Sequence, residues 1–138
     1  MALSKAISTI LNNDATITAF AADRIYPGIA PFNVNLPFIV VKVGNKTPDR
    51  NVTSDFDWMR CEVEVDVVSK FYTDTETYTD LIVTALNRYS GTVDSEVIDT
   101  IIYEGETAEY YERLTEGGTT TGQGVFERQI NFTLIKKQ

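Results

Sequence analysis

Apolar positions recur along this chain with two periods, which predict helices and strands in turn. Near the N-terminus they repeat every three to four residues, which predicts a helix over Ala2–Asn12. A second, shorter helix follows, and Asp14 is placed to cap it. Both helices are short, so we expect them to depend on packing against a sheet.

Prolines shape the next part of the chain before an alternating pattern begins. Three prolines within Asp23–Pro37 fix φ and favour an ordered, extended bend, with a turn at Tyr26-Pro27-Gly28. Phe38–Val43 is predicted as a strand with apolar residues on both faces, so one end of it should be covered on both sides. Gly44–Asp55 is polar and is predicted as a loop or as the tip of a hairpin.

Phe56–Ser69 shows a long alternation that predicts a half-buried antiparallel strand. Its inward row is Met59, Cys61, Val63, Val65 and Val67, and its outward row is Arg60, Glu62, Glu64 and Asp66. Neighbours in the acidic row are about 7 Å apart, which favours a solvated or subunit-facing row over a metal site. Cys61 is expected to be a core residue, because the chain has no histidine to activate it as a nucleophile.

The main helix is predicted over Thr73–Tyr89. Thr73 and Glu76 form a plausible capping box, and Gly91 is the predicted stop. An apolar stripe at helical spacing is expected to lie on the sheet; its residues are Tyr78, Leu81, Ile82, Ala85, Leu86 and Tyr89.

The remaining chain predicts two strands separated by a glycine-rich stretch. Val97–Tyr103 is a strand with Ile98 and Ile102 on one face, and Ala108–Arg113 either continues it or forms a loop. Thr115–Gly124 contains four glycines and is expected to be mobile in an isolated subunit. Val125–Ile135 alternates again and is predicted as the last strand; Phe126, Ile130, Phe132 and Leu134 face inward.

The predicted order is two helices, two strands, one helix and two strands. It lacks the strand–helix alternation of a parallel sheet and therefore indicates an α+β fold. We expect an antiparallel or mixed sheet of about four main strands, with one long helix and a short N-terminal helical pair packed on it. A chain of 138 residues fits a single domain over 1–138.

Charge changes the functional outlook. The net charge is −8, and Asp94–Glu116 holds eight acidic residues against one basic residue, Arg113. Such a chain is repelled by phosphate backbones, which argues against tight nucleic-acid binding. The acidic segment is either a solvated face that aids solubility or a surface presented to a partner or to passing DNA.

Candidate chemistry is sparse. Without histidine and with one cysteine, the sequence excludes ordinary zinc sites and an internal disulfide. Phosphate loops, dinucleotide fingerprints and hydrolase motifs do not occur. The N-terminus lacks the pattern of a signal peptide, and the sequence predicts no membrane span. We therefore expect no catalytic residue, no metal and no cofactor.

The order of several short motifs resembles the tail-completion family of long-tailed phages, also called tail-terminator or tail-to-head joining proteins. The motifs include Asp-Arg-Ile-Tyr-Pro-Gly-Ile-Ala-Pro at 23–31, Leu-Pro-Phe-Ile-Val-Val at 36–41 and Arg-Cys-Glu-Val-Glu-Val-Asp-Val-Val-Ser at 60–69. Tyr-Thr-Asp-Leu-Ile-Val-Thr-Ala-Leu at 78–86 and Phe-Glu-Arg-Gln-Ile-Asn-Phe-Thr-Leu at 126–134 complete the resemblance, which spans nearly the whole chain.

The resemblance implies a structural virion protein at the head-proximal end of the tail, assembled in the host cytoplasm. Such a protein forms a ring with copies of itself, commonly a hexamer, caps the tail tube and meets the head connector or stopper. DNA passes through the ring without specific binding. The alternatives are a head-side neck or stopper protein, a non-viral acidic interaction module or inhibitor, and a small enzyme.

Two polar loops, Gly44–Asp55 and Glu112–Gly124, are expected to become ordered on assembly. Together with the acidic strand row they are the candidate interfaces with neighbouring subunits, with the neck or, for the row, with the channel. The candidate residues are Lys46, Asp49, Arg50, Asp55, Glu62, Glu64, Asp66, Arg113, Glu116, Thr119 and Thr120.

Overall fold

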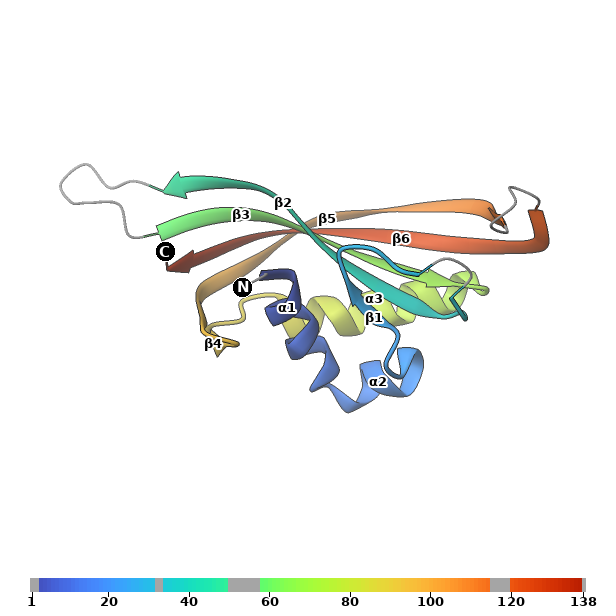
Figure 1. Ribbon diagram of the computed structural model, residues 1–138, viewed down its shortest axis with the longest axis horizontal. Helices are drawn as coiled ribbons and strands as arrows, with labels where there is room; N and C mark the ends of the chain where they lie inside the picture. Colours follow the sequence, from blue (N-terminus) through green and yellow to red (C-terminus); the bar gives the residue numbers. More distant parts are fainter. Residues whose placement is uncertain (1–2, 32–33, 50–57, 115–119, 138) are drawn as a thin grey trace.

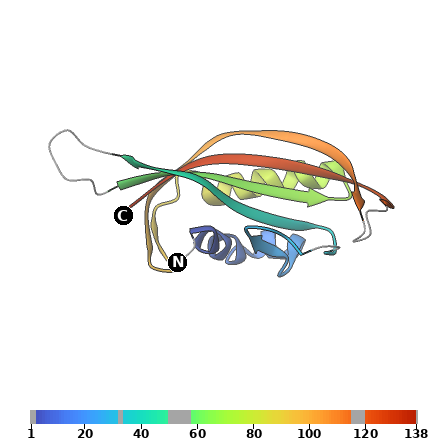
Figure 2. The same ribbon diagram turned by 45° about the horizontal axis from the view of Figure 1, so that its top comes forward.

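The computed structural model describes residues 3–31, 34–49, 58–114 and 120–137. In these residues a long, twisted sheet carries three helices on one face (Figures 1 and 2). The helices are α1 (Leu3–Asn12), α2 (Ala15–Ala21) and α3 (Tyr72–Leu86). The strands are β1 (Ile25–Pro27), β2 (Phe38–Asp49), β3 (Trp58–Ser69), β4 (Gly91–Val93), β5 (Glu96–Leu114) and β6 (Thr120–Lys137).

The sheet has six strands among the described residues, in the order β1-β2-β3-β6-β5-β4. The pairing of β1 with β2 is parallel, and the other four pairings are antiparallel. The predicted α+β class with a mixed sheet is confirmed, whereas the count of about four strands is too low. Strands β1 and β4 are three residues each, which is too short to leave an alternating pattern in the sequence.

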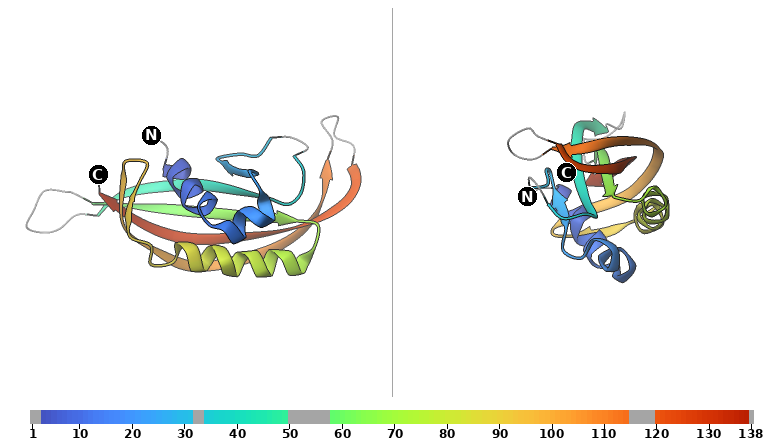
Figure 3. Two further views of the ribbon diagram at one scale, coloured as in Figure 1. Left: turned by 90° about the horizontal axis from the view of Figure 1, so that it is seen from below. Right: turned by 90° about the vertical axis from the view of Figure 1, so that its right-hand side faces the viewer.

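The main core lies between the sheet and the helices. The inward row of β3, from Cys61 to Val67, is buried, as are Ile130, Phe132 and Leu134 of β6. Figure 3 shows all three helices laid over this face of the sheet. Full burial of one such aliphatic side chain contributes about 1.5–3 kcal/mol, so this layer provides the principal stabilisation.

A second, smaller apolar cluster lies on the opposite, helix-free face of the sheet. Its buried members are Phe38 and Val40 of β2, Val68 of β3 and Val125 of β6. Ala30, Val34 and Leu36, which come from the proline-containing segment after β1, pack against it. The expectation that one end of the strand beginning at Phe38 is covered on both sides is therefore confirmed.

The N-terminal helices follow the prediction closely. In α1 the apolar residues Leu3, Ile7 and Leu11 are buried against the sheet. Asp14 caps α2, because its Oδ1 accepts hydrogen bonds from the backbone N–H groups of Thr16 and Ile17 at 2.9 and 3.2 Å.

Helix α3 forms where expected but begins and ends differently. Its N-cap is Phe71, which makes no side-chain capping bond, so the predicted Thr73–Glu76 capping box is wrong. Ser69 organises this end instead: its Oγ accepts from the N–H of Phe71 at 3.2 Å and donates to Asp74 at 3.2 Å. The helix ends at Leu86, and Gly91 opens β4 and is not the stop.

The bend at 23–37 contains a strand that the sequence did not reveal. Ile25–Pro27 pairs parallel with Ile39–Val41, so the turn predicted at Tyr26-Pro27-Gly28 is wrong in its first two residues. The bend is fixed further by Arg24, whose Nε donates to the carbonyl oxygen of Pro37 at 2.8 Å. The Leu36–Pro37 peptide bond is cis.

Strand β2 runs beyond its predicted end at Val43, as far as Asp49. The polar residues 44–49 were predicted as a loop, but they pair with β3 after a register shift between Val43 and Lys46. Backbone pairing therefore overrides the low strand propensity of this polar segment. The rest of the predicted loop, 50–55, lies outside the described residues.

Strand β5 is likewise longer than the predicted Val97–Tyr103 and continues through Ala108 to Leu114. A register shift between Ile98 and Thr100 puts Ile98 and Ile101 in the core and leaves Ile102 41% exposed, so the predicted faces are wrong.

Strand β6 begins at Thr120, inside the stretch predicted to be mobile. The ring of Tyr110 lies where a Cβ on Gly124 would have to sit, which explains a glycine at that position. Residues 115–119 lie outside the described residues.

Candidate functional site

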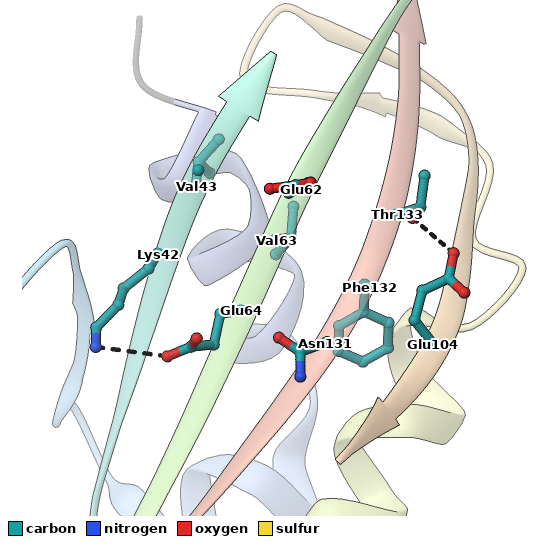
Figure 4. A pocket seen from close by; sticks show the side chains of 10 residues that line it. Lys42, Val43, Glu62, Val63, Glu64, Glu104, Asn131, Phe132 and Thr133 are labelled. Atoms are coloured by element: carbon teal, nitrogen blue, oxygen red, sulfur yellow. Dashed lines mark hydrogen bonds and ion pairs between the residues drawn. The ribbon is translucent and has the colours of Figure 1, made fainter. Parts of the chain in front are cut away.

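The helix-free face of the sheet is the candidate functional surface. Side chains that point away from the helices on β2, β3, β5 and β6 line a shallow hollow of about 630 Å³ (Figure 4). Alternation places them there, because every second residue of each strand turns to this face. Glu62 and Glu64 of β3 and Glu104 of β5 give this lining three carboxylates against one cation, Lys42. Apolar residues border it as well, namely Val43, Val63 and Phe132.

A single lysine holds two of the carboxylates on this face. Lys42 Nζ lies 2.9 Å from Asp66 and 3.5 Å from Glu64, and about half of the lysine side chain is exposed. The pKa of Lys42 is raised chiefly by its hydrogen bond to Asp66. Sequence reasoning did not single out Lys42, although it lies two positions before Gly44 on the neighbouring predicted strand.

Asp66 departs from the expectation of a solvated acidic row. Only 1% of its surface is exposed, and its Oδ1 has no hydrogen-bond partner among the described residues. Burial, followed by the adjacent Glu64, raises the pKa of Asp66 to about 7. The row is therefore graded: Glu62 is exposed, Glu64 is half-buried and Asp66 is buried.

Further polar contacts fix the neighbouring side chains on both faces of β5. Glu104, on the helix-free face, accepts a hydrogen bond from Thr133 Oγ1 at 2.6 Å. On the helix side, Glu106 accepts from Tyr103 Oη at 2.6 Å and pairs with Arg128 at 2.8 Å. The Arg128 guanidinium also lies 5.3 Å from the centre of the Tyr72 ring.

The other sequence-predicted interface residues lie at the two ends of the sheet. Lys46 is exposed near the end of β2, and Asp49 closes that strand. Arg113 and Thr120 belong to the far ends of β5 and β6. The structure therefore separates the β2 group from the β5–β6 group. Lys46 lies opposite Cys61, the neighbour of Glu62 in the sequence, and is therefore on the other face of the sheet from Glu62. Arg50, Asp55, Glu116 and Thr119 lie outside the described residues.

The described part of the chain offers little for covalent or metal chemistry. Cys61 is fully buried, and burial raises the pKa of its thiol, which disfavours the reactive thiolate. Over the same residues, no group of three or more acidic or cysteine side chains is arranged to hold a metal ion. None of the described helices is long and apolar enough to cross a membrane.

Comparison with known proteins decides the family. The family described as tail completion protein gp17 matches residues 5–114. The chain belongs to this family. Tail completion proteins are structural proteins of the phage tail, and this member is accordingly a structural component of the virion.

Solved structures agree on the fold. Among 28 matching chains is one from the "Virion of native gene transfer agent (GTA) particle". It superimposes with a TM-score of 0.71 at 13% identity, over 99% of this chain and 96% of its own length. A search of curated proteins found no match. The tail completion fold is thus shared with a phage-like particle despite little sequence identity.

Proposed function

We propose that this tail completion protein caps the tail tube as a ring and forms the tail-side surface for joining to the head. The observation that carries the proposal is the family match over 5–114, which spans from α1 to the end of β5. In this role the protein contacts copies of itself, the tail tube and the head connector or stopper.

The electrostatics of the helix-free face support a position around a DNA channel. Glu62, Glu64 and Glu104 give this face a negative field, with Lys42 already engaged by Asp66 and Glu64. A wall of this sign repels phosphate groups and lets DNA pass without being held. The three helices then lie on the outside of the ring.

The two ends of the sheet suit contacts above and below the ring. The end of β2 and the C-terminal part of β6 lie at one end of the long axis, and the β5–β6 hairpin lies at the other (Figure 1). With the strands running along the channel, one end faces the tail tube and the other the connector. The predicted interface residues at the ends, such as Lys46 and Arg113, are candidates for these contacts.

Electron microscopy of the purified protein mixed with isolated tail tubes tests the proposal. We expect a ring at one end of each tube, and class averages should show six copies. Rings found on isolated head connectors and not on tubes would favour a head-side stopper. If neither structure is decorated at protein concentrations well above those of the particles, the capping role is wrong.

A further inference from the structure

Among the residues that the structure describes, the sheet has two partly open edges, one on each side. On the outer side of β2, strand β1 pairs only with Ile39–Val41, so 42–49 has a strand neighbour on one side only within the described chain. At the opposite edge, β4 pairs only with Glu96–Ile98 of β5. The linker after α3 covers two further residues, because Ile101 and Tyr103 bond to Arg88 and Asn87. From Gly105 onward, the described residues place no strand against β5. Long open edges are templates for pairing with another chain.

Backbone groups on both open edges point outward at defined positions. The N–H of Tyr103 donates to Asn87, away from β6, so the Tyr103–Phe132 pair is not bonded across the ladder. Glu106 and Ala108 oppose Ile130 and Arg128 of β6. By register and alternation, their backbone N–H and C=O groups also point away from β6, towards the open edge. On β2, Ile39 and Val41 bond outward to the β1 segment. The same alternation continues across the register shift in β2. It points the backbone groups of Val43 and Lys46, and the carbonyl group of Pro48, towards the open edge.

The two edges carry opposite charge. The open part of β2 contains Lys42, Lys46 and, at its end, Asp49, a net charge of +1; the open part of β5 contains Glu106, Glu109, Glu112 and Arg113, a net charge of −2. The charges also match by face. Lys42, which Asp66 and Glu64 already hold, and Glu109 lie in rows that turn to the helix-free face. Lys46 and Glu106, which also pairs with Arg128, lie in rows that turn to the helix side. Opposite charges on neighbouring strands stabilise pairing and select its register.

Strand directions favour a head-to-tail arrangement. Three antiparallel pairings separate β2 from β5, so the two strands run in opposite directions. Rotation about an axis along the strands preserves these directions, so β5 of one copy meets β2 of the next in antiparallel orientation. Because the open segments lie towards opposite ends of the sheet, neighbours are staggered along the strands, as in closed barrels of tilted strands. Contacts between different surfaces of identical subunits close into rings when the rotation between neighbours closes, and otherwise give open filaments.

We propose that the open edge of β5 in one copy pairs antiparallel with the open edge of β2 in the next, joining their sheets into one continuous wall. The partner is thus a second copy of this chain, recognised by main-chain hydrogen bonds and by the lysine–glutamate match. This inference rests on the proposed ring and specifies its interface.

Proline substitution at an outward-facing position tests the pairing without breaking the internal ladder. Ala108→Pro removes an N–H that β6 does not use, and proline is tolerated at such edge positions. The matched control is Ala108→Val, which keeps the N–H. We expect both variants to fold, as judged by circular dichroism and thermal unfolding. Ala108→Pro should lower the fraction of tail tubes that carry a ring at least about tenfold, because each copy loses an interface hydrogen bond. Undiminished rings with a folded Ala108→Pro protein would overturn the edge pairing.

Cross-linking provides a second measurement that does not depend on a loss of function. In a Cys61→Ser background, Thr47→Cys and Thr107→Cys place thiols on the helix-free face of the two edges, where both side chains are exposed. A short bis-maleimide should join copies into a ladder when tail tubes are present. The control replaces Thr107→Cys by Thr77→Cys on the exposed side of α3 and should give no ladder.

The outcomes separate the interface from the ring itself. Wild-type rings together with an absent Thr47–Thr107 ladder would overturn the edge pairing and leave the capping role intact. Absence of wild-type rings on tubes would overturn both. A ladder together with loss of rings in Ala108→Pro, but not in Ala108→Val, supports the inference.

Discussion

At the scale of single residues, Asp66 shows what an alternating pattern predicts and what it leaves out. The pattern assigned Asp66 to the outer row of its strand, and the structure agrees. Asp66 lies beside an apolar cluster that a distant segment completes: it opposes Val40, and Val34 and Leu36 pack on the cluster that contains Val40 and Val68. A local pattern defines the face on which a residue lies, but only long-range packing determines its depth. The ion pair between Lys42 and Asp66 was missed for the same reason, because it forms between two strands and leaves no local pattern.

The raised pKa of Asp66 predicts a pH dependence of stability. The pKa is about 7 when folded, against an ordinary value of 3.8, so the folded state binds the proton more tightly. Through this group, the free energy of unfolding should therefore fall as pH rises from about 4 to about 7 and level off above. We expect Asp66→Asn to remove this fall, which a shift of this size puts at no more than about 4 kcal/mol. Urea unfolding of both proteins at a series of pH values measures the difference; parallel curves would contradict the assignment.

Lys42→Met provides the complementary measurement. Above about pH 7 it leaves the Asp66 carboxylate buried without a cation, whereas at about pH 5 that carboxyl group is protonated and needs none. The variant should therefore be destabilised more at high pH than at low pH. Equal destabilisation at both values would indicate that the lysine contributes only through packing of its aliphatic stem.

At the scale of elements, the sequence predicted the helices and the central strands but not the edges of the sheet. Long periodic segments such as α1 and β3 bury a full row of side chains, so their pattern is explicit. Strands β1 and β4 are held by main-chain pairing, and residues 44–49 and 120–124 join the sheet although their side chains are polar or absent. Register shifts in β5 then change which residues face the core. Such features depend on the partner strand and leave no local periodicity.

Helix capping offers a matched pair of substitutions at this scale. Asp14→Ala removes both hydrogen bonds at the start of α2 and should lower the free energy of unfolding by about 1 kcal/mol. Thr73→Ala alters the residue that sequence reasoning placed in a capping box, yet the start of α3 has no side-chain cap. Its effect should stay within about 0.5 kcal/mol. Denaturant unfolding of both variants checks this. A larger loss in the free energy of unfolding for Thr73→Ala would indicate that Thr73 does cap the helix, as the sequence predicted.

At the scale of the whole molecule, the arrangement separates an acidic face from a face covered by helices. If the acidic face lines the channel, reversing its charge should hinder DNA passage. Glu62→Lys with Asn131→Lys adds three positive charges to exposed positions there. We expect assembled particles with slowed DNA release, measured by dye uptake on ejected DNA. The control, Glu76→Lys with Thr77→Lys on α3, adds the same charge to the opposite side and should release DNA normally.

The far end of the sheet makes a separate prediction. Deletion of residues 117–122 shortens the connection between β5 and β6 and removes the first residues of β6. We expect a folded subunit, because the core residues from Val125 onward are retained, but tails that do not join heads. Counting free tails and free heads by electron microscopy tests this. Normal yields of infectious particles would show that this end is not a contact surface.

Strand β1 has one further consequence. It stops after Pro27, where Gly28 adopts a φ of +93° and its N–H makes a last bond to Val41. A longer β1 would continue along 42–49 and satisfy within one chain the hydrogen bonds that we assign to a neighbour. In such a subunit its own β1 would occupy the open edge of β2, so that edge could not take part in the proposed pairing. The three-residue length of β1 thus leaves 42–49 available for the proposed pairing with a neighbour.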